Sequence, residues 1–322
     1  MSALSLYPHQ VGGRKRLRRQ KRLILGDDMG MGKTPQAITA SMPPVLIICP
    51  LGARDHWMTL FRQWQPKAKP TTSVVDVQNG EANVLVVLWG ELEVGRDFSP
   101  GKPPKKPGIK RLLDVEWRTI VADEAHLAKN RKAQRTIGLR LLSRLETSER
   151  VFLLTGTPIP NGRATELWSL LNILDPKRFS SYWRYVEEEV LREPVHGAPP
   201  FVFKELELRR PEHFRRNVVD KYILRREKDD PEFRDQYPEK MPPTVYKIDL
   251  EGKQLKAYKE MADEMLTLVG DELLLAQNAL SQFSRLRQLA LSLGIIDPKL
   301  ADESAKIKVL DEIVEGHPQP LV

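Results

Sequence analysis

The sequence predicts an α/β protein built on a mostly parallel β-sheet with flanking helices. Short apolar runs of β-forming residues alternate with helix-compatible stretches through the first half of the chain, which is the rhythm of strands joined by crossover helices. A glycine-rich turn directly after the first run opens a helix, as in many sheets of this kind. The predicted strands cover residues 23–25, 45–49, 84–88, 119–122 and 151–154.

Composition limits where the protein acts and what it binds. The longest apolar runs are far shorter than the roughly 20 residues of a bilayer span, so no membrane segment is expected. The first ten residues lack the features of a signal peptide, which predicts a cytoplasmic protein; a bacterial or viral setting fits, and a nuclear one stays open. Cys49 is the only cysteine, so a buried reduced thiol is expected rather than a disulfide. The net charge of +8 permits a polyanionic partner without requiring one.

The 322 residues are enough for about two domains. Proline, glycine and lysine dominate 96–108, which predicts a surface loop. The second half has helical spacing of its apolar residues, and we expect a first domain over 1–227 with a helical insertion over 165–227. A proline-rich linker over 228–243 then leads to a second unit over 244–322. In that unit we expect one strand at 245–250 and helices over 254–268, 271–293 and 305–315.

The glycine-rich turn has the features of a phosphate-binding loop. An apolar strand is followed by glycines at 30 and 32, and Lys33-Thr34 opens a helix. Glycines let backbone N–H groups approach phosphate oxygens, the Lys33 ammonium neutralises the β and γ phosphates, and the Thr34 hydroxyl ligates Mg²⁺. Asp27 stands where the usual loop pattern has a glycine, so the Gly-x-Gly-Lys-Thr portion carries the signal.

Two adjacent carboxylates follow another predicted strand, in the string Asp-Glu-Ala-His over 123–126. Behind a phosphate loop, Asp123 would hold Mg²⁺ through water and Glu124 would orient and deprotonate the attacking water. We therefore expect Lys33, Asp123 and Glu124 to be the catalytic residues. The histidines show no metal-ligand spacing, and for His126 a coupling role is favoured over metal ligation.

The strings LLTGTPIPN at 153–161 and ELWSLLN at 166–172 make the chain resemble the Swi/Snf-type branch of superfamily-two helicase-like ATPases. Tyr7-Pro-His-Gln10 resembles that family's adenine-recognising glutamine motif, and further matches follow in order, including Leu224-Arg-Arg226. The resemblance implies a RecA-like first lobe and the start of a second, mostly helical one. It also implies an ATP site at Gln10, Asp28, Met29, Gly30, Met31, Gly32, Lys33 and Thr34, with Mg²⁺ on Thr34 and Asp123.

The same resemblance implies residues for coupling and for DNA. Coupling between ATP and DNA is expected at His126, Thr155, Gly156 and Thr157. DNA contacts are expected at Pro50, Leu51, Gly52, Arg54, Lys129, Asn130, Asn161 and Arg163.

The expected activity is that of an ATP-driven, DNA-dependent translocase or remodelling motor on double-stranded DNA, with ATP and Mg²⁺ as cofactors. Two alternatives stay open: a nucleotide- or DNA-binding module without turnover of its own, and an RNA helicase. The family's arginine finger, which reaches the γ-phosphate from the second lobe, cannot be assigned in this sequence. We therefore expect an incomplete motor, with the rest of the second lobe supplied by a further segment or a second chain.

Overall fold

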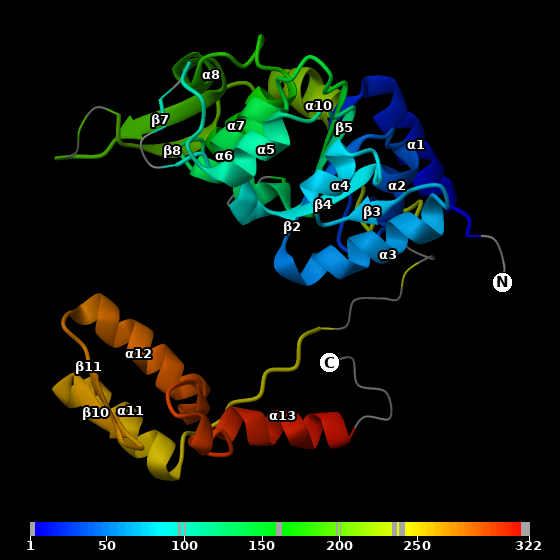
Figure 1. Ribbon diagram of the computed structural model, residues 1–322. Helices are drawn as coiled ribbons and strands as arrows, with labels where there is room; N and C mark the ends of the chain where they lie inside the picture. Colours follow the sequence, from blue (N-terminus) through cyan, green and yellow to red (C-terminus); the bar gives the residue numbers. More distant parts are fainter. Residues whose placement is uncertain are drawn as a thin grey trace. The chain divides into compact units, whose positions relative to one another are not determined.

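The structure is a computed structural model that describes residues 4–95, 98, 99, 101–158, 163–197, 199, 201–233, 237 and 242–316. The chain divides into two compact units, residues 1–239 and 240–322. Figure 1 shows a sheet with helices in the first unit and helices with a small hairpin in the second. The predicted linker over 228–243 begins with residues that belong to the first unit, since Phe233 is buried there.

The first unit is built on a seven-stranded sheet in the order β3-β4-β2-β5-β6-β1-β9. All neighbouring strands are parallel. The five strands expected from the sequence are confirmed, and two short edge strands were not predicted. The strands are β1 (Arg22–Leu25), β2 (Val45–Cys49), β3 (Pro70–Thr71), β4 (Val84–Leu88), β5 (Thr119–Ala122), β6 (Arg150–Leu154) and β9 (Ile223–Leu224).

Alternate side chains of the central strands point into two separate hydrophobic cores, because successive residues of a strand face opposite sides. One face is covered by α1 (Pro8–Gln20), α2 (Lys33–Ala40) and α3 (Arg54–Trp64). The other face is covered by α4 (Val74–Gln78), α5 (Pro107–Leu113), α6 (Gln134–Leu142) and α7 (Ala164–Leu174). Burial on both faces explains why the central strands read as unbroken apolar runs.

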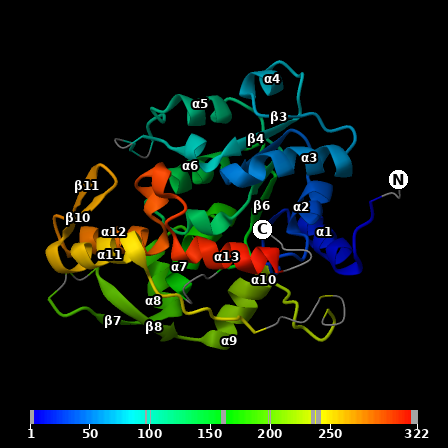
Figure 2. The ribbon, with the colours of Figure 1, turned by 90° about the horizontal axis from the view of Figure 1, so that it is seen from below.

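The region expected to be a helical insertion is only partly helical. After α7 come α8 (Tyr182–Glu189) and an antiparallel hairpin of β7 (Val190–Pro194) and β8 (Phe203–Leu208). The hairpin lies beside α8 in Figures 1 and 2. Proline and glycine in the hairpin's turn prevent a helix from continuing there. The chain returns to the sheet through α9 (Pro211–Phe214), a π-helical turn (Arg215–Val219) and α10 (Asp220–Tyr222) before β9.

The second unit is mostly helical, as expected, but two details of the expectation are wrong. Residues 242–250 form no strand, and the predicted helices meet at an antiparallel hairpin instead. The hairpin turns at Gly270, whose φ of +58° suits glycine, and its alternating burial has the period of a strand. The elements are α11 (Gly252–Glu264), β10 (Leu266–Val269), β11 (Glu272–Leu275), α12 (Ala279–Leu291) and α13 (Ala305–Glu315). Among the described residues of the whole chain, no helix has the length and apolar character of a membrane span.

Candidate nucleotide site

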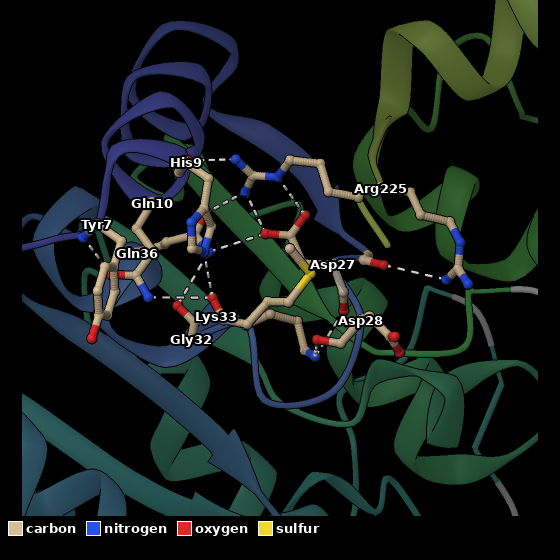
Figure 3. Close-up of polar contacts among 12 residues, drawn as sticks. Tyr7, His9, Gln10, Asp27, Asp28, Gly32, Lys33, Gln36 and Arg225 are labelled. Atoms are coloured by element: carbon tan, nitrogen blue, oxygen red, sulfur yellow. Dashed lines mark hydrogen bonds and ion pairs between the residues drawn. The ribbon is translucent and has the colours of Figure 1, made fainter. Parts of the chain in front are cut away.

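The phosphate loop lies between the carboxyl end of β1 and the start of α2. Gly30 and Gly32 have φ values of +79° and +72°, a left-handed conformation that glycine adopts without strain. Lys33 Nζ donates hydrogen bonds to the carbonyl oxygens of Asp27 at 2.9 Å and Asp28 at 3.1 Å, as Figure 3 shows. Burial lowers the pKa of Lys33, against the opposing effect of nearby carboxylates. The loop therefore presents a partly desolvated ammonium inside a glycine-lined turn, which fits a polyphosphate.

Asp123 and Glu124 follow β5 directly, at the same edge of the sheet as the phosphate loop, because β1 and β5 both pair in parallel with β6. Asp123 Oδ1 accepts a hydrogen bond from the Glu124 N–H at 3.0 Å. Glu124 has a φ of +48°, which is uncommon for a residue with a side chain and often marks a functional turn. The carboxylate pair is thus held in a fixed local geometry beside the loop.

Two tryptophans orient Asp123, and the sequence did not predict this role for them. Trp57 Nε1 donates to Asp123 Oδ2 at 2.8 Å, and Trp89 Nε1 donates to the Asp123 carbonyl at 3.0 Å. Both indoles are buried, so their N–H groups need partners and the aspartate receives fixed ones. Trp57 lies on α3, and Trp89 follows β4.

The residues expected to couple ATP to DNA lie against the loop and the carboxylates. His126 Nδ1 is 3.0 Å from Glu124 Oε2 and 3.3 Å from Thr155 Oγ1. Thr155 Oγ1 also accepts a hydrogen bond from the Thr157 N–H at 3.1 Å. A side chain at Gly156 would begin 3.7 Å from Lys33 Nζ. The structure therefore brings the turn after β6 close to both the phosphate loop and the Asp123-Glu124 pair.

Gln10, expected to recognise adenine, packs against the phosphate loop at Met31. Its Nε2 donates to the carbonyl oxygen of Met31 at 3.3 Å, and its Oε1 accepts from the Tyr7 N–H at 3.0 Å. His9 Nε2 lies 3.1 Å from the same Met31 oxygen. A side chain at Gly32 would overlap Gln10 Nε2, so this glycine is required for the close approach. Figure 3 shows Tyr7, His9 and Gln10 grouped beside the loop.

A buried ion pair beneath the loop was missed by the sequence reasoning. Asp27 is 0% exposed and pairs with Arg226, which follows β9. Gln36 of α2 bridges them, donating to Asp27 Oδ2 at 3.0 Å and accepting from Arg226 Nη2 at 2.9 Å. Two local signals were present: Asp27 departs from the usual loop pattern, and Arg226 belongs to the Leu-Arg-Arg motif. Their pairing, 199 residues apart, is visible only in three dimensions.

The residues expected to contact DNA follow the carboxyl ends of three adjacent strands. Pro50, Leu51, Gly52 and Arg54 lie after β2, and Arg54 is paired with Asp55 at 3.6 Å. Lys129 and Asn130 come after β5, and Lys129 Nζ is 3.4 Å from Glu166 Oε2. Arg163 precedes α7, whereas Asn161 lies outside the described residues. The described members therefore share the edge of the sheet that carries the phosphate loop.

Thr34 and Asp123 fit the ligand preference of Mg²⁺ for oxygen. Magnesium that acts with phosphates usually takes only one or two protein ligands and keeps several waters. The described part of the chain contains no group of three or more His, Cys, Asp or Glu side chains able to hold a metal by itself. Thr34 and Asp123 come from the two halves of the site that flank β6.

A parallel sheet with a phosphate loop after β1 and a carboxylate pair after β5 defines a P-loop protein of the RecA-like kind. The family model of the SNF2-related domain matches residues 14–294, and the chain belongs to this family.

Curated relatives agree with this assignment, and a solved structure agrees with the fold. The chain is 26% identical to the CHD3-type chromatin-remodeling factor CHR7 of Arabidopsis thaliana, over 97% of this chain and 26% of that protein. It is 28% identical to the SWI/SNF chromatin-remodeling complex subunit snf22 of Schizosaccharomyces pombe, over 84% of this chain and 15% of that protein. The SWI2/SNF2 ATPase core of Sulfolobus solfataricus in complex with dsDNA matches in fold, with a TM-score of 0.59 and 24% identity. That match covers 97% of this chain and 64% of the solved one. The chain thus spans only part of the proteins that it resembles.

Proposed function

We propose that the chain is the ATP-binding part of a motor that hydrolyses ATP and translocates on double-stranded DNA. The observation that carries the proposal is the meeting of Lys33, the Asp123-Glu124 pair and Thr155 at one edge of the sheet, in a chain of the SNF2-related family. Relatives named as chromatin-remodelling factors and a related core solved with dsDNA support DNA as the polymer on which it acts.

Each residue of the proposed site would have a separate role in phosphoryl transfer. Lys33 and the N–H groups of the glycine turn would bind the β and γ phosphates. Mg²⁺ on Thr34 and Asp123 would supply positive charge to the phosphate oxygens. Glu124 would orient a water whose oxygen attacks the γ-phosphorus as the bond to the bridging oxygen of ADP breaks. The water's proton passes to the Glu124 carboxylate.

Coupling to DNA would run through the turn after β6 and the Asp-Glu-Ala-His string. His126 contacts both Glu124 and Thr155. A shift of the turn that carries Thr155 would therefore move His126, and His126 would in turn move Glu124, the proposed base. The DNA residues proposed along this edge would contact mainly phosphates, which makes binding tolerant of sequence and strongly dependent on salt. The proposed setting is any compartment that holds DNA, the bacterial cytoplasm or the nucleus.

Fast turnover in related phosphoryl-transfer enzymes also uses an arginine finger, which contributes roughly 10³- to 10⁵-fold in rate. We propose that this arginine comes from a second lobe, in a further segment or a second chain, and not from the phosphate-loop unit. The rate of the 322-residue chain should then rise when such a lobe is supplied.

The test is a steady-state ATPase assay with a complete second lobe present, with duplex DNA, RNA or no polymer added. Stimulation by duplex DNA is expected. Stimulation by RNA alone would identify an RNA helicase, and tight ATP binding with no turnover under any condition would leave a binding module. Glu124→Gln should keep ATP binding and lose hydrolysis, because an amide has the size of a carboxylate but cannot take the proton. Normal turnover by this variant would remove Glu124 from the mechanism.

A further inference from the structure

Asp27 is a carboxylate at a place where an approaching polyphosphate would be repelled. It lies in the phosphate loop itself, and its side chain is completely buried. A buried charge is strongly unfavourable unless it is paired and hydrogen-bonded. Asp27 meets both conditions: the Arg226 guanidinium binds both of its oxygens, with Nε 2.9 Å from Oδ1, and Gln36 donates to Oδ2 at 3.0 Å. We call Asp27, Arg226 and Gln36 the latch.

Backbone hydrogen bonds also join the phosphate loop to the end of β9 and the residues that follow it. Strand β9 pairs in parallel with β1, and this pairing continues past the end of both strands into the loop. The Gly26 N–H donates to the carbonyl of Leu224 at 2.7 Å, and the Asp28 N–H donates to the carbonyl of Arg226 at 2.9 Å. The first half of the phosphate loop is therefore fixed to 224–226 by main chain and side chain together.

Arg226 also reaches the proposed adenine side of the site. Its Nη1 donates to the carbonyl oxygen of His9, the neighbour of Gln10. Helix α1 can pass close to this guanidinium because residue 13 is a glycine, where a side chain would begin 2.9 Å from Arg226 Nη2 and overlap Gln36. A single guanidinium thus joins the loop, α2 and the start of α1.

The segment that follows Arg226, residues 227–233, lies against the same site and precedes the end of the first unit. A side chain at Gly30 would begin 3.2 Å from Lys228 Nζ, so this lysine lies beside the loop. Phe233 is buried, and its ring packs edge-on against His9 with the ring centres 5.4 Å apart. This stretch of chain continues toward the second unit, which starts at residue 240.

We propose that the latch couples occupation of the phosphate loop to the segment 227–233, and that Arg226 is a positioning residue for the nucleotide. The inference rests on the proposed function, because it assigns a regulatory contact to the same ATP site. A phosphate group can bind only when the loop has one particular shape, and Asp27 holds that shape through Arg226. Coupling is reciprocal, so whatever moves the segment 227–233 must change the affinity for ATP by the same factor as ATP changes the segment.

The experiment compares ATP affinity, by calorimetry on the full chain, among latch variants and a matched control. The variants are Asp27→Asn, Arg226→Gln, Arg226→Lys and the double variant Asp27→Asn with Arg226→Gln. The control is Arg22→Gln: Arg22 is another half-buried arginine of the first unit, and it donates to the carbonyl oxygens of Ser143, Ser148, Ile173 and Leu174. Hydrogen exchange of residues 223–233 is measured with and without ATP.

Asp27→Asn and Arg226→Gln are each expected to weaken ATP binding by roughly 5- to 150-fold, the range of coupling between linked sites. The double variant should bind ATP no more weakly than the worse single one, because both changes break the same contact. Arg226→Lys should bind ATP more tightly than Arg226→Gln but more weakly than the unaltered chain, since an ammonium cannot bind both oxygens of a carboxylate as the planar guanidinium does. ATP should slow exchange over 223–233 in the unaltered chain and not in Arg226→Gln, and Arg22→Gln should lose stability but keep its ATP affinity.

The direction in which Asp27→Asn changes the affinity for ATP separates a positioning role of Asp27 from a purely electrostatic one. If Asp27 acted only by its charge, Asp27→Asn would tighten ATP binding, and that result would overturn the proposal. Equal affinities for all folded variants, or no protection of 223–233 by ATP, would overturn it as well. Should Arg226→Gln not fold, the double variant and Arg226→Lys still decide between these outcomes. No ATP binding by the unaltered chain would instead refute the proposed function, and this inference with it.

Discussion

Two adjacent glycines in α1 offer a sharp test of the packing beneath the phosphate loop. In a helix interior, alanine is more favourable than glycine by about 1 kcal/mol. Gly12 is exposed, and a side chain there would have its nearest neighbour, Arg226 Nη1, at 4.0 Å, an ordinary contact distance. Gly12→Ala should therefore stabilise the first unit by up to about 1 kcal/mol.

Gly13→Ala should have the opposite effect. Its methyl group would overlap Gln36 Oε1, and Gln36 is fully buried and cannot swing into solvent. Moving Gln36 breaks its hydrogen bonds to Asp27 and from Arg226, which are 3.0 and 2.9 Å long. Hydrogen bonds to charged groups contribute about 1.5–3 kcal/mol each, which gives a loss of about 3–6 kcal/mol. After the helix gain of about 1 kcal/mol, the net destabilisation is about 2–5 kcal/mol.

The assay is urea unfolding followed by tryptophan fluorescence. All six tryptophans, at 57, 64, 89, 117, 168 and 183, belong to the first unit, so the signal reports that unit alone. Midpoints that shift in opposite directions for Gly12→Ala and Gly13→Ala are expected. If Gly13→Ala is as stable as Gly12→Ala, the hydrogen bonds of Gln36 contribute little and the reasoning is wrong.

Three further results are expected. Lys33→Ala should abolish ATP binding in calorimetry, because it removes the ammonium that faces the proposed β and γ phosphates; unchanged affinity would refute the assignment. Glu205→Gln should lower the free energy of unfolding by about 1–2 kcal/mol in urea titrations, because Glu205 accepts hydrogen bonds from the Ala164 N–H and the Thr165 hydroxyl at 2.6 Å each and so caps the N-terminus of α7. Burial raises the pKa of Cys49 to about 12 from 9.0, so a thiol reagent at pH 8 should react only as the first unit unfolds. Stability should also fall as the pH rises from about 9 toward 12, because only the unfolded chain forms the thiolate in that window.

Much of the fold could be predicted because the central strands are buried on both faces and therefore appear as apolar runs. The two edge strands could not be found in this way. Each is only two residues long, and β9 is recognisable only by its pairing with β1. The hairpins failed for another reason: each of their strands is only four to six residues long, which is too short for a clear alternating pattern.

The same distinction applies to the candidate site: its local motifs could be predicted from the sequence, and the distant residues that contact them could not. Gln10, the phosphate loop and the Asp123-Glu124 pair are local strings, and the structure places each of them at the same sheet edge. The partners of these strings come from distant parts of the sequence. Nothing near Asp123 indicates that indoles at positions 57 and 89 will orient it, and nothing near Asp27 indicates an arginine at 226. A motif identifies the groups that do chemistry, whereas the groups that hold them require the tertiary structure.

The charges at this sheet edge explain why the loop can contain an aspartate. Lys33 is the cation that faces the proposed phosphates, and an unpaired carboxylate on Asp27, whose carbonyl oxygen Lys33 Nζ contacts at 2.9 Å, would offset much of its attraction. Asp27 does not do so, because its side chain is turned beneath the loop and its charge is neutralised by Arg226. Arg226 therefore offsets the Asp27 charge near Lys33, and the loop gains a side-chain attachment that a glycine at position 27 could not provide. By this reasoning the departure from the usual loop pattern is the feature that ties the nucleotide site to the segment leaving the first unit, and the affinity for ATP and the position of that segment should change together.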